Sequence, residues 1–213
     1  MTVGEFRRFV TETGYKTDAE KGGYCWTWDG EWKIKHGANW RDLKFSQDEN
    51  HPVVCVSWND VVAFAKWLSK KTGYKFRLPT EAEWEYACRS GGKKVKYATS
   101  TGDLSHDLAN YWGKGGRDKW EYTAPVGSFP PNVGIYDMCG NVWEWCEDWY
   151  DKNYYGRSPK NDPQGPKNGK YRVLRGSSWN GGPWIMRCAL RSGYVPGSRE
   201  DDVGFRLVRL SGQ

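Results

Sequence analysis

The residues with the clearest capacity for chemistry lie between Asp137 and Glu144, where oxygen-bearing groups are closely spaced. Asp137 precedes the run Gly140-Asn141-Val142-Trp143-Glu144-Trp145, so two carboxylates and several main-chain carbonyls fall in one short segment. Hard cations such as calcium prefer oxygen ligands, and a tight glycine turn allows carbonyl groups to converge on one ion. The pattern therefore predicts a cation site. The alternative is a turn beside a buried tryptophan pair.

The composition predicts one domain over residues 1–213. No linker, repeat or low-complexity tract divides the 213 residues. Hydrophobic content is only 38%, but 16% of the residues are aromatic, and large aromatic side chains can build a core from few residues. The 26 glycines and 10 prolines favour irregular, turn-rich structure over long helices.

The charge pattern gives no sign of a nucleic-acid partner. The net charge is +6, but the basic residues are interleaved with acidic ones, and the longest basic cluster, 91–96, is short. The sequence has no apolar run that could span a membrane, and its start does not resemble a signal peptide. We therefore expect a cytoplasmic protein, or one displayed at the surface through a missing N-terminal segment or a partner.

The six cysteines do not form a zinc-binding pattern, because none belongs to a CxxC pair and no histidine lies near them in sequence. Cys88 and Cys188 lie in apolar contexts and are predicted to be buried, inert thiols. Cys139 and Cys146 flank the Gly140–Trp145 run and could form a disulfide or remain free.

Periodicity and capping signals predict an α+β fold with short strands. Glu5–Thr13, Ser57–Lys70 and a segment starting at Thr80 are predicted helices, and the last two begin at cap-like sequences. Residues 22–50 show no clear period and are predicted to be loop. The predicted strands are Tyr74–Leu78, Ala124–Ser128, Trp143–Trp149, Arg172–Arg175, Arg187–Ser192 and Gly204–Leu210.

Several segments carry a family resemblance. They are Thr2–Phe6, His51–Trp58, Arg77–Ala87, Gly140–Trp145, Arg172–Gly176 and Gly204–Arg206, in that order. The chain resembles the formylglycine-generating-enzyme (sulfatase-modifying factor) family, a branch of the C-type lectin fold. The resemblance covers nearly the whole chain, although the strands that usually precede the position of Thr2 are absent. It implies two helices with short antiparallel strands and much irregular loop.

The resemblance implies two structural calcium sites. The first would use the side chains of Asp137 and Glu144 with the carbonyls of Gly140 and Val142. The second would use the side chains of Asn110 and Asp118 with the carbonyls of Tyr111 and Trp120. All of these ligands are oxygens, as calcium prefers.

The catalytic residues of the family do not carry over. The enzymes bind copper through two cysteines, and soft thiolates are what that metal requires. The corresponding stretch, 177–186, contains no cysteine, and Cys188 matches a non-catalytic position. The three histidines, His36, His51 and His106, are far apart, so the iron-dependent branch of the fold is not indicated either. We therefore expect no copper and no catalytic residue, which favours the non-catalytic branch.

The C-terminal part resembles the variable region of diversity-generating retroelement proteins, in which fixed frame positions alternate with diversified ones. The frame would be Gly176, Trp179, Arg187, Ala189, Arg191, Pro196, Arg199, Gly204, Phe205 and Arg206, within the region 176–206. The contiguous residues 184–186 would form an exposed apolar patch, or they would pack under the loop as local core. The candidate ligand-binding residues are Ser178, Asn180, Gly181, Gly182, Trp184, Ile185, Met186, Leu190, Ser192, Gly193, Tyr194, Val195, Ser198, Glu200 and Asp201.

The sequence thus favours a non-enzymatic ligand-binding protein on a calcium-stabilised scaffold. Rigid aromatic anchors suit a protein ligand, and the chain lacks the sugar-coordinating Glu-Pro-Asn or Gln-Pro-Asp signature, which argues against a sugar. The alternatives are an oxidoreductase of the formylglycine-generating type and an accessory domain of a larger protein. The sequence leaves the ligand and the oligomeric state open.

Overall fold

The computed structural model describes residues 1–210, and its helices begin where the sequence supplies caps. The helices are α1 (Val3–Thr13), α2 (Asp18–Gly22), α3 (Trp58–Thr72) and α4 (Glu81–Cys88), with short 3-10 turns η1 (Tyr154–Gly156) and η2 (Pro183–Ile185). Ser57 caps α3 and Thr80 caps α4, each in a reciprocal capping box with the acidic residue three positions later. The predicted starts of both helices are therefore confirmed. Helix α2 was not predicted.

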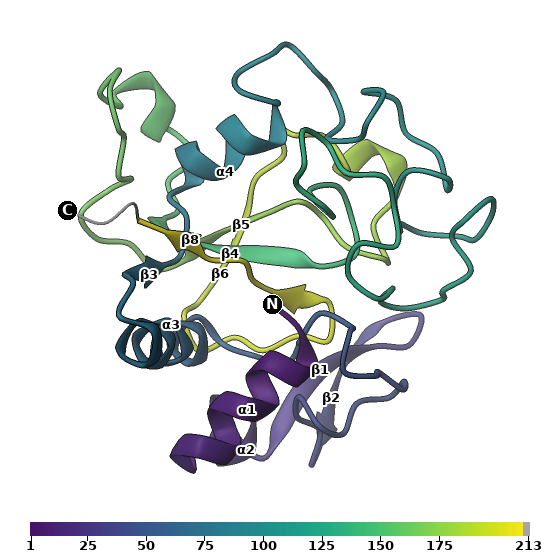
Figure 1. Cartoon of the computed structure of the whole chain (residues 1–213), viewed down its shortest axis with the longest axis vertical. Coiled ribbons are helices and arrows are strands. Elements are labelled where there is room, and N and C mark those ends of the chain that lie inside the picture. The colour runs from purple at the N-terminus through teal and green to yellow at the C-terminus, as the bar shows by residue number, and fades with distance from the viewer. Residues whose placement is uncertain (211–213) are drawn as a thin grey trace.

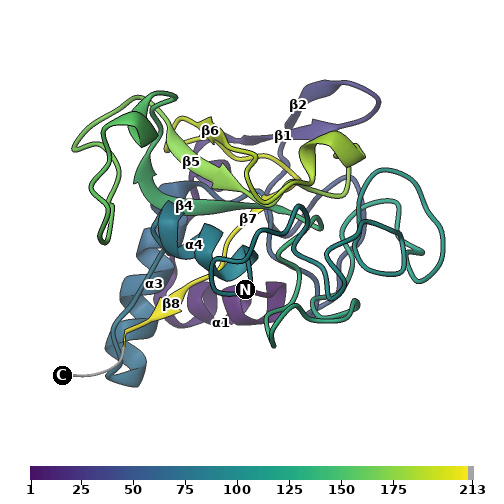
Figure 2. The same cartoon turned by 90° about the horizontal axis from the view of Figure 1, so that it is seen from above.

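The central sheet has the strand order β6-β5-β4-β7 (Figures 1 and 2). The strands are β4 (Trp143–Trp149), β5 (Arg172–Arg175), β6 (Ser192–Tyr194) and β7 (Val203–Gly204). The pairs β4–β5 and β5–β6 are antiparallel, whereas β4 and β7 are parallel. The predicted strands over 143–149 and 172–175 are confirmed to the residue.

The prediction that residues 22–50 form only loop was wrong. Strands β1 (Tyr24–Trp28) and β2 (Trp32–His36) pair as an antiparallel hairpin. Cys25 and Thr27 are buried, whereas the residues on either side of them are not. Gly30 adopts a φ of 77° in the turn, so Asp29-Gly30 is the kind of sequence that reverses a hairpin.

Other predicted strands are shorter, displaced or absent. Of Tyr74–Leu78 only β3 (Phe76–Arg77) is a strand, and it pairs with β8 (Val208–Arg209). The expected strand over 204–210 is divided between β7 and β8, and that over 187–192 reaches the sheet only at Ser192. Residues 124–128 form no strand, and residues 89–142 contain no named helix or strand, because turns and loop hydrogen bonds carry that segment.

Aromatic residues form the main core, as the composition predicted. The ring of Phe6 in α1 lies 5.2 Å from that of Trp40 and 5.7 Å from that of Phe64 in α3. Phe205 packs against Phe64 at 5.4 Å and so joins the helices to the chain that follows β7. A second buried cluster forms around Trp84 of α4 and includes Met138, Cys146 and Met186.

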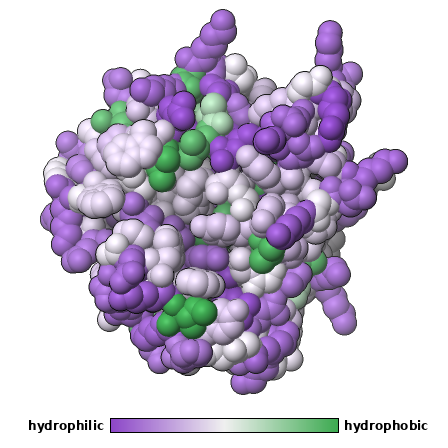
Figure 3. All heavy atoms as spheres, turned by 180° about the vertical axis from the view of Figure 1, so that it is seen from behind, coloured by the Kyte–Doolittle hydropathy of each residue, from purple (hydrophilic) through white to green (hydrophobic). Residues whose placement is uncertain are grey.

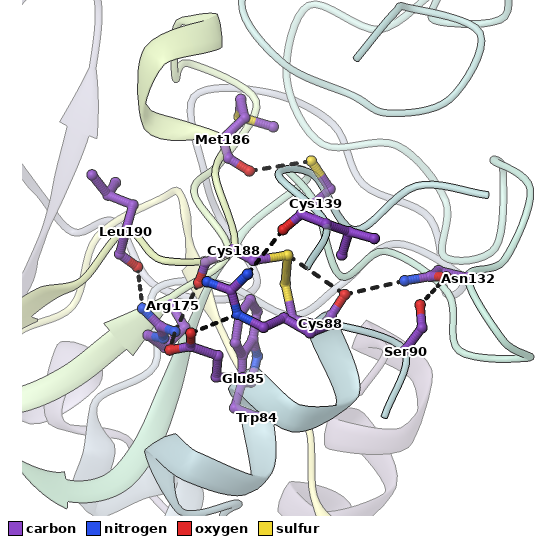
Figure 4. Close-up of a disulfide and its surroundings, with 12 residues drawn as sticks. Trp84, Glu85, Cys88, Ser90, Asn132, Cys139, Arg175, Met186, Cys188 and Leu190 are labelled. Atoms are coloured by element: carbon purple, nitrogen blue, oxygen red, sulfur yellow. Dashed lines mark hydrogen bonds and ion pairs between the residues drawn. A yellow bond between two sulfur atoms is a disulfide. The ribbon is translucent and has the colours of Figure 1, made fainter. Parts of the chain in front are cut away.

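Two disulfides join segments that are distant in the sequence. Cys25 of β1 is bonded to Cys55, and Cys88 at the end of α4 is bonded to Cys188 (Figure 4). The prediction that Cys88 and Cys188 are inert thiols was therefore wrong, because folding brings two buried cysteines together across 100 positions. Cys139 and Cys146 are free and buried. None of the helices within residues 1–210 has the length and apolar character needed to cross a membrane.

Candidate ligand pocket and ion sites

An aromatic pocket of about 420 Å³ lies where the β1–β2 turn, the 112–122 loop and the start of the 177–186 loop meet. Four aromatic side chains line it together with charged and small residues. The lining residues are Trp28, Asp29, Gly30, Trp112, Gly113, Lys114, Glu121, Tyr122, Trp179 and Asn180. Aromatic walls with a few polar groups are typical of ligand sites.

The walls of this pocket are held by packing and by backbone hydrogen bonds. The ring of Tyr122 lies 4.9 Å from that of Trp179 and stacks on that of Phe45 at 4.4 Å. The amide of Trp112 donates to the Gly181 carbonyl at 3.0 Å, which fastens one loop to the other. The amide of Trp28 donates to Asp201 Oδ2 at 3.0 Å.

Of the residues that line the pocket, the sequence predicted only two. Asn180 was predicted to bind the ligand, and Trp179 was predicted to be a fixed frame position. The other three aromatics were missed because their segments lie far from the C-terminal region and meet it only in the fold. The signal that could have found Trp28 is the Asp29-Gly30 turn beside it. Trp112 is 62% exposed, and so large an exposed fraction of a tryptophan indicates a contact surface.

The predicted ligand-binding residues divide by burial. Trp184 is 68% exposed and Val195 39% exposed, so both are available to a partner. Partly exposed are Asn180, Ile185, Leu190, Ser192, Gly193, Tyr194 and Ser198. Buried are Ser178, Gly181, Gly182, Met186, Glu200 and Asp201.

The buried members offer a partner little surface, so their assignment to the ligand-binding surface stays a prediction. Met186 belongs to the core cluster under α4, so the contiguous patch 184–186 is not exposed as a unit. The Ser178 hydroxyl points inward, and its Oγ lies within hydrogen-bond distance of Asp202. Any binding surface on this segment therefore depends on single exposed side chains. On the face shown in Figure 3, hydrophilic residues cover most of the surface, and hydrophobic residues form only a few small patches.

Asn110 and Asp118, the side-chain ligands predicted for the second calcium site, lie together in the interior. The Asn110 amide nitrogen is 3.1 Å from Asp118 Oδ1, and His106 Nδ1 is 3.1 Å from Asp118 Oδ2. The amides of Tyr111 and Trp120 also donate to this carboxylate, at 3.4 and 3.3 Å. The side-chain oxygen Oδ1 of Asn110 is buried without a partner, and burial raises the pKa of Asp118. An orphaned oxygen beside a buried carboxylate with no lysine or arginine partner fits a hard cation.

The first predicted set is arranged differently. Arg206 donates two hydrogen bonds of 2.6 Å to Glu144, and the Trp84 indole donates a third, also of 2.6 Å. Asp137 Oδ2 accepts from the Gly127 amide at 2.8 Å. These residues do not fit a calcium ion in this arrangement, because the guanidinium already supplies the positive charge beside Glu144.

Glycine is required at position 140 for a reason other than metal binding. Gly140 has a φ of 81°, and a Cβ there would lie 2.1 Å from the Asn110 carbonyl oxygen. The Asn141 amide donates to the same carbonyl at 2.9 Å. The Gly140–Trp145 turn is therefore packed directly against the backbone of the second predicted calcium site. Val142, another predicted ligand, is buried in this turn.

Neither free cysteine offers a reactive thiolate. Cys139 is 4% exposed and Cys146 is fully buried. Burial raises the pKa of the Cys139 thiol to about 12 and that of Cys146 well above its ordinary value. Soft-metal binding and thiol oxidation both require the thiolate. These thiols are therefore protonated and inert at neutral pH.

The fold and the site define a domain of the C-type lectin type. It lacks the copper-binding cysteine pair that the enzymes with this fold use. The sequence model of the sulfatase-modifying factor enzyme 1-like domain matches residues 1–211, so the chain belongs to this family. It is 38% identical to the formylglycine-generating enzyme of Mus musculus over 243 residues, covering 98% of this chain and 63% of that enzyme. The chain thus spans less than two thirds of the length of that relative.

Solved structures extend the comparison to proteins of other kinds. PvdO from Pseudomonas aeruginosa is 34% identical and superposes with a TM-score of 0.78, covering 98% of this chain and 77% of PvdO. Treponema denticola variable protein 1 is 31% identical with a TM-score of 0.69, covering 80% of this chain and 77% of that structure. The predicted formylglycine-generating-enzyme type of C-type lectin fold is confirmed.

Proposed function

We propose that this chain is a non-enzymatic binding protein whose contact surface combines the aromatic pocket with the exposed residues of 177–198. The observation that carries the proposal is the state of the cysteines. No cysteine lies in the stretch 177–186, and the two free thiols are buried and protonated. A copper-dependent oxidase of this family would have no thiolate to use.

The exposed side chains favour binding to a protein. Trp112 and Trp184 are exposed on adjoining loops, and the Trp112–Gly181 hydrogen bond joins those loops. Rigid aromatic residues give a large contact area at a low entropic cost. The resemblance to Treponema denticola variable protein 1 supports a surface of this kind and its diversification between relatives.

Sequencing codons 170–213 from many clones of the source population tests the diversified form of the proposal. We expect substitutions to concentrate at exposed positions such as Trp184 and Val195. The buried positions Gly176, Arg175 and Asp202 should remain fixed, because a change there disturbs the core. An invariant segment would contradict diversification and would favour a partner of fixed identity.

The second candidate is an oxidoreductase, which the 38% identity to mouse formylglycine-generating enzyme favours. It is tested by incubating the purified protein with copper and a Cys-x-Pro-x-Arg peptide. Oxidation of the peptide cysteine would revive the enzymatic reading and overturn the proposal. We expect neither stoichiometric copper binding nor oxidation.

Calcium is proposed as a structural ion at the second set only, held by Asn110 and Asp118 with carbonyls of Tyr111 and Trp120. Calcium at about 100 times its Kd should stabilise the fold by about 2.7 kcal/mol. We expect the unfolding temperature to rise with calcium in the wild type but not in Asp118→Asn. The matched control Asp103→Asn changes an exposed aspartate and should keep the full response. An equal response of both variants would place any calcium elsewhere.

A further inference from the structure

Three consecutive acidic residues, which we call the acidic latch, are buried behind the pocket. Glu200, Asp201 and Asp202 are 6%, 0% and 1% exposed. No salt bridge within residues 1–210 involves them. Each carboxyl group also keeps one oxygen without a hydrogen-bond partner: Glu200 Oε2, Asp201 Oδ1 and Asp202 Oδ1. An ionised carboxylate in such surroundings is costly unless it is paired.

The acidic latch joins the two pocket walls. Asp201 Oδ2 accepts the amide of Trp28, which lies on the hairpin wall, at 3.0 Å. Asp202 Oδ2 lies 2.7 Å from Ser178 Oγ, and that hydroxyl lies 2.8 Å from Asn180 Oδ1 on the opposite wall. A serine hydroxyl has one proton to donate. With the Asn180 amide oriented as it is here, both short contacts are hydrogen bonds only when Asp202 carries a proton and donates it to Ser178.

The backbone of the same residues holds three parts of the fold together. The Glu200 carbonyl accepts from the Cys55 amide at 2.9 Å, and the Asp202 carbonyl accepts from the Trp143 amide of β4 at 2.8 Å. The Asp201 amide donates to the Trp26 carbonyl of β1 at 2.9 Å. Asp201 and Asp202 reach opposite walls. Because no salt bridge among the described residues neutralises these buried carboxyl groups, they lose their charge by taking up protons.

The charged and titratable groups that face the acidic latch do not neutralise it. Lys44 contributes positive charge near Asp201, but its ammonium group is paired with Asp29. Arg199 lies over the Tyr24 ring at 3.9 Å, and Tyr194 of β6 faces Glu200 and Asp202. Burial, with the neighbouring Asp202, raises the pKa of Glu200 and of Asp201 to about 8, and burial alone raises that of Asp202 to about 7.

We propose that the acidic latch is a pH-sensitive device that keeps the hairpin wall and the Ser178 wall closed on the pocket while its carboxyl groups are protonated, and that releases them as those protons are lost. This inference rests on the proposed function, because the walls are those of the proposed binding pocket. Opening exposes the carboxyl groups to water, where each of them has its ordinary pKa. The free energy of opening therefore falls as the pH rises from the pKa of these groups in water to their pKa in the buried state. It stays constant above about pH 8.

Amide hydrogen exchange on the intact chain tests the acidic latch without any ligand. After correction for intrinsic exchange, the protection of the Trp28 amide should fall between pH 5 and pH 8 by about tenfold per pH unit for each proton released. Phe64, inside α3, should stay better protected than Trp28 throughout. Equal protection at pH 5 and pH 8 would overturn the proposal, and so would a fall that takes Phe64 to the same value, because the whole protein would then be unfolding.

A matched pair of variants isolates the carboxyl groups. The double variant Asp201→Asn with Asp202→Asn keeps acceptor oxygens but cannot ionise, and it should lose most of the pH dependence at Trp28. Asp103→Asn makes the same change at an exposed site and should retain it. If the double variant does not fold, carbon-13 titration of the wild-type carboxyl groups decides: midpoints near or above neutrality support the proposal, and midpoints below about pH 5 overturn it. Sequencing of the source population tests the proposed binding function and does not depend on these measurements. The proposed function and the acidic latch can therefore fail separately.

Discussion

Replacing Cys88 and Cys188 together with alanine is expected to lower the free energy of unfolding by about 4.7 kcal/mol. The Cys88–Cys188 disulfide closes a loop across a sequence separation of 100 residues, and the constraint it places on the unfolded chain grows with the size of that loop. It also joins the end of α4 to the base of the 177–190 segment (Figure 4). Guanidinium denaturation of the non-reduced proteins measures the difference.

The second disulfide provides a matched comparison. Cys25 and Cys55 are separated by 30 residues, for which the same relation gives about 3.7 kcal/mol. Both double variants remove two buried sulfur atoms, so the difference between them reports mainly on loop size. An equal or larger loss from the Cys25–Cys55 variant would contradict the entropic explanation. It would indicate that local packing around the hairpin dominates.

Replacing Arg175 with leucine is expected to destabilise the fold by about 3 to 5 kcal/mol. Arg175 has no exposed surface and forms an ion pair with Glu85 of α4. Its guanidinium also donates to the Cys188 carbonyl at 2.8 Å and to that of Leu190 (Figure 4). Leucine would leave these buried acceptors without a donor, and desolvated unpaired groups are expensive.

An exposed arginine gives the control for this substitution. Arg157 pairs with Asp151 at the surface, where its side chain is 64% exposed, and Arg157→Leu should cost at most about 1 kcal/mol. Urea denaturation of both variants compares the same chemical change in two environments. A loss below about 1 kcal/mol in Arg175→Leu would show that the ion-pair network is dispensable and that leucine packs equally well there.

Local signals in the sequence predicted the elements that local chemistry determines. The capping boxes at Ser57 and Thr80 gave the starts of α3 and α4, and the aromatic runs gave β4 and β5. The hairpin at 24–36 was missed even though Asp29-Gly30 was visible, because Trp- and Gly-rich sequence masks a two-residue period. Local rules were therefore enough for helix starts but not for a short strand pair.

Features that depend on contacts between distant segments could not be read from one sequence. The pairing of Cys88 with Cys188 and the meeting of Trp28, Trp112 and Trp179 arise only when the chain is folded. Glu200 and Asp201 were predicted to belong to the ligand-binding surface but are buried, and burial of adjacent carboxyl groups contradicts their usual preference. Residues that are buried against their usual preference thus mark the places where contacts between distant segments determine the structure.

The interleaving of buried and exposed positions in the 177–198 segment matters for protein engineering. The segment is fastened near its start by the hydrogen bond from the Trp179 amide to the Asn141 carbonyl, and near its middle by the Cys88–Cys188 disulfide. A combinatorial library that randomises Trp184, Leu190 and Val195 would change the displayed chemistry and leave the fastening intact. Randomising Ser178 or Met186 as well would fill the same library with clones that fail to fold. The fraction of folded variants would then fall as the number of encoded variants rose.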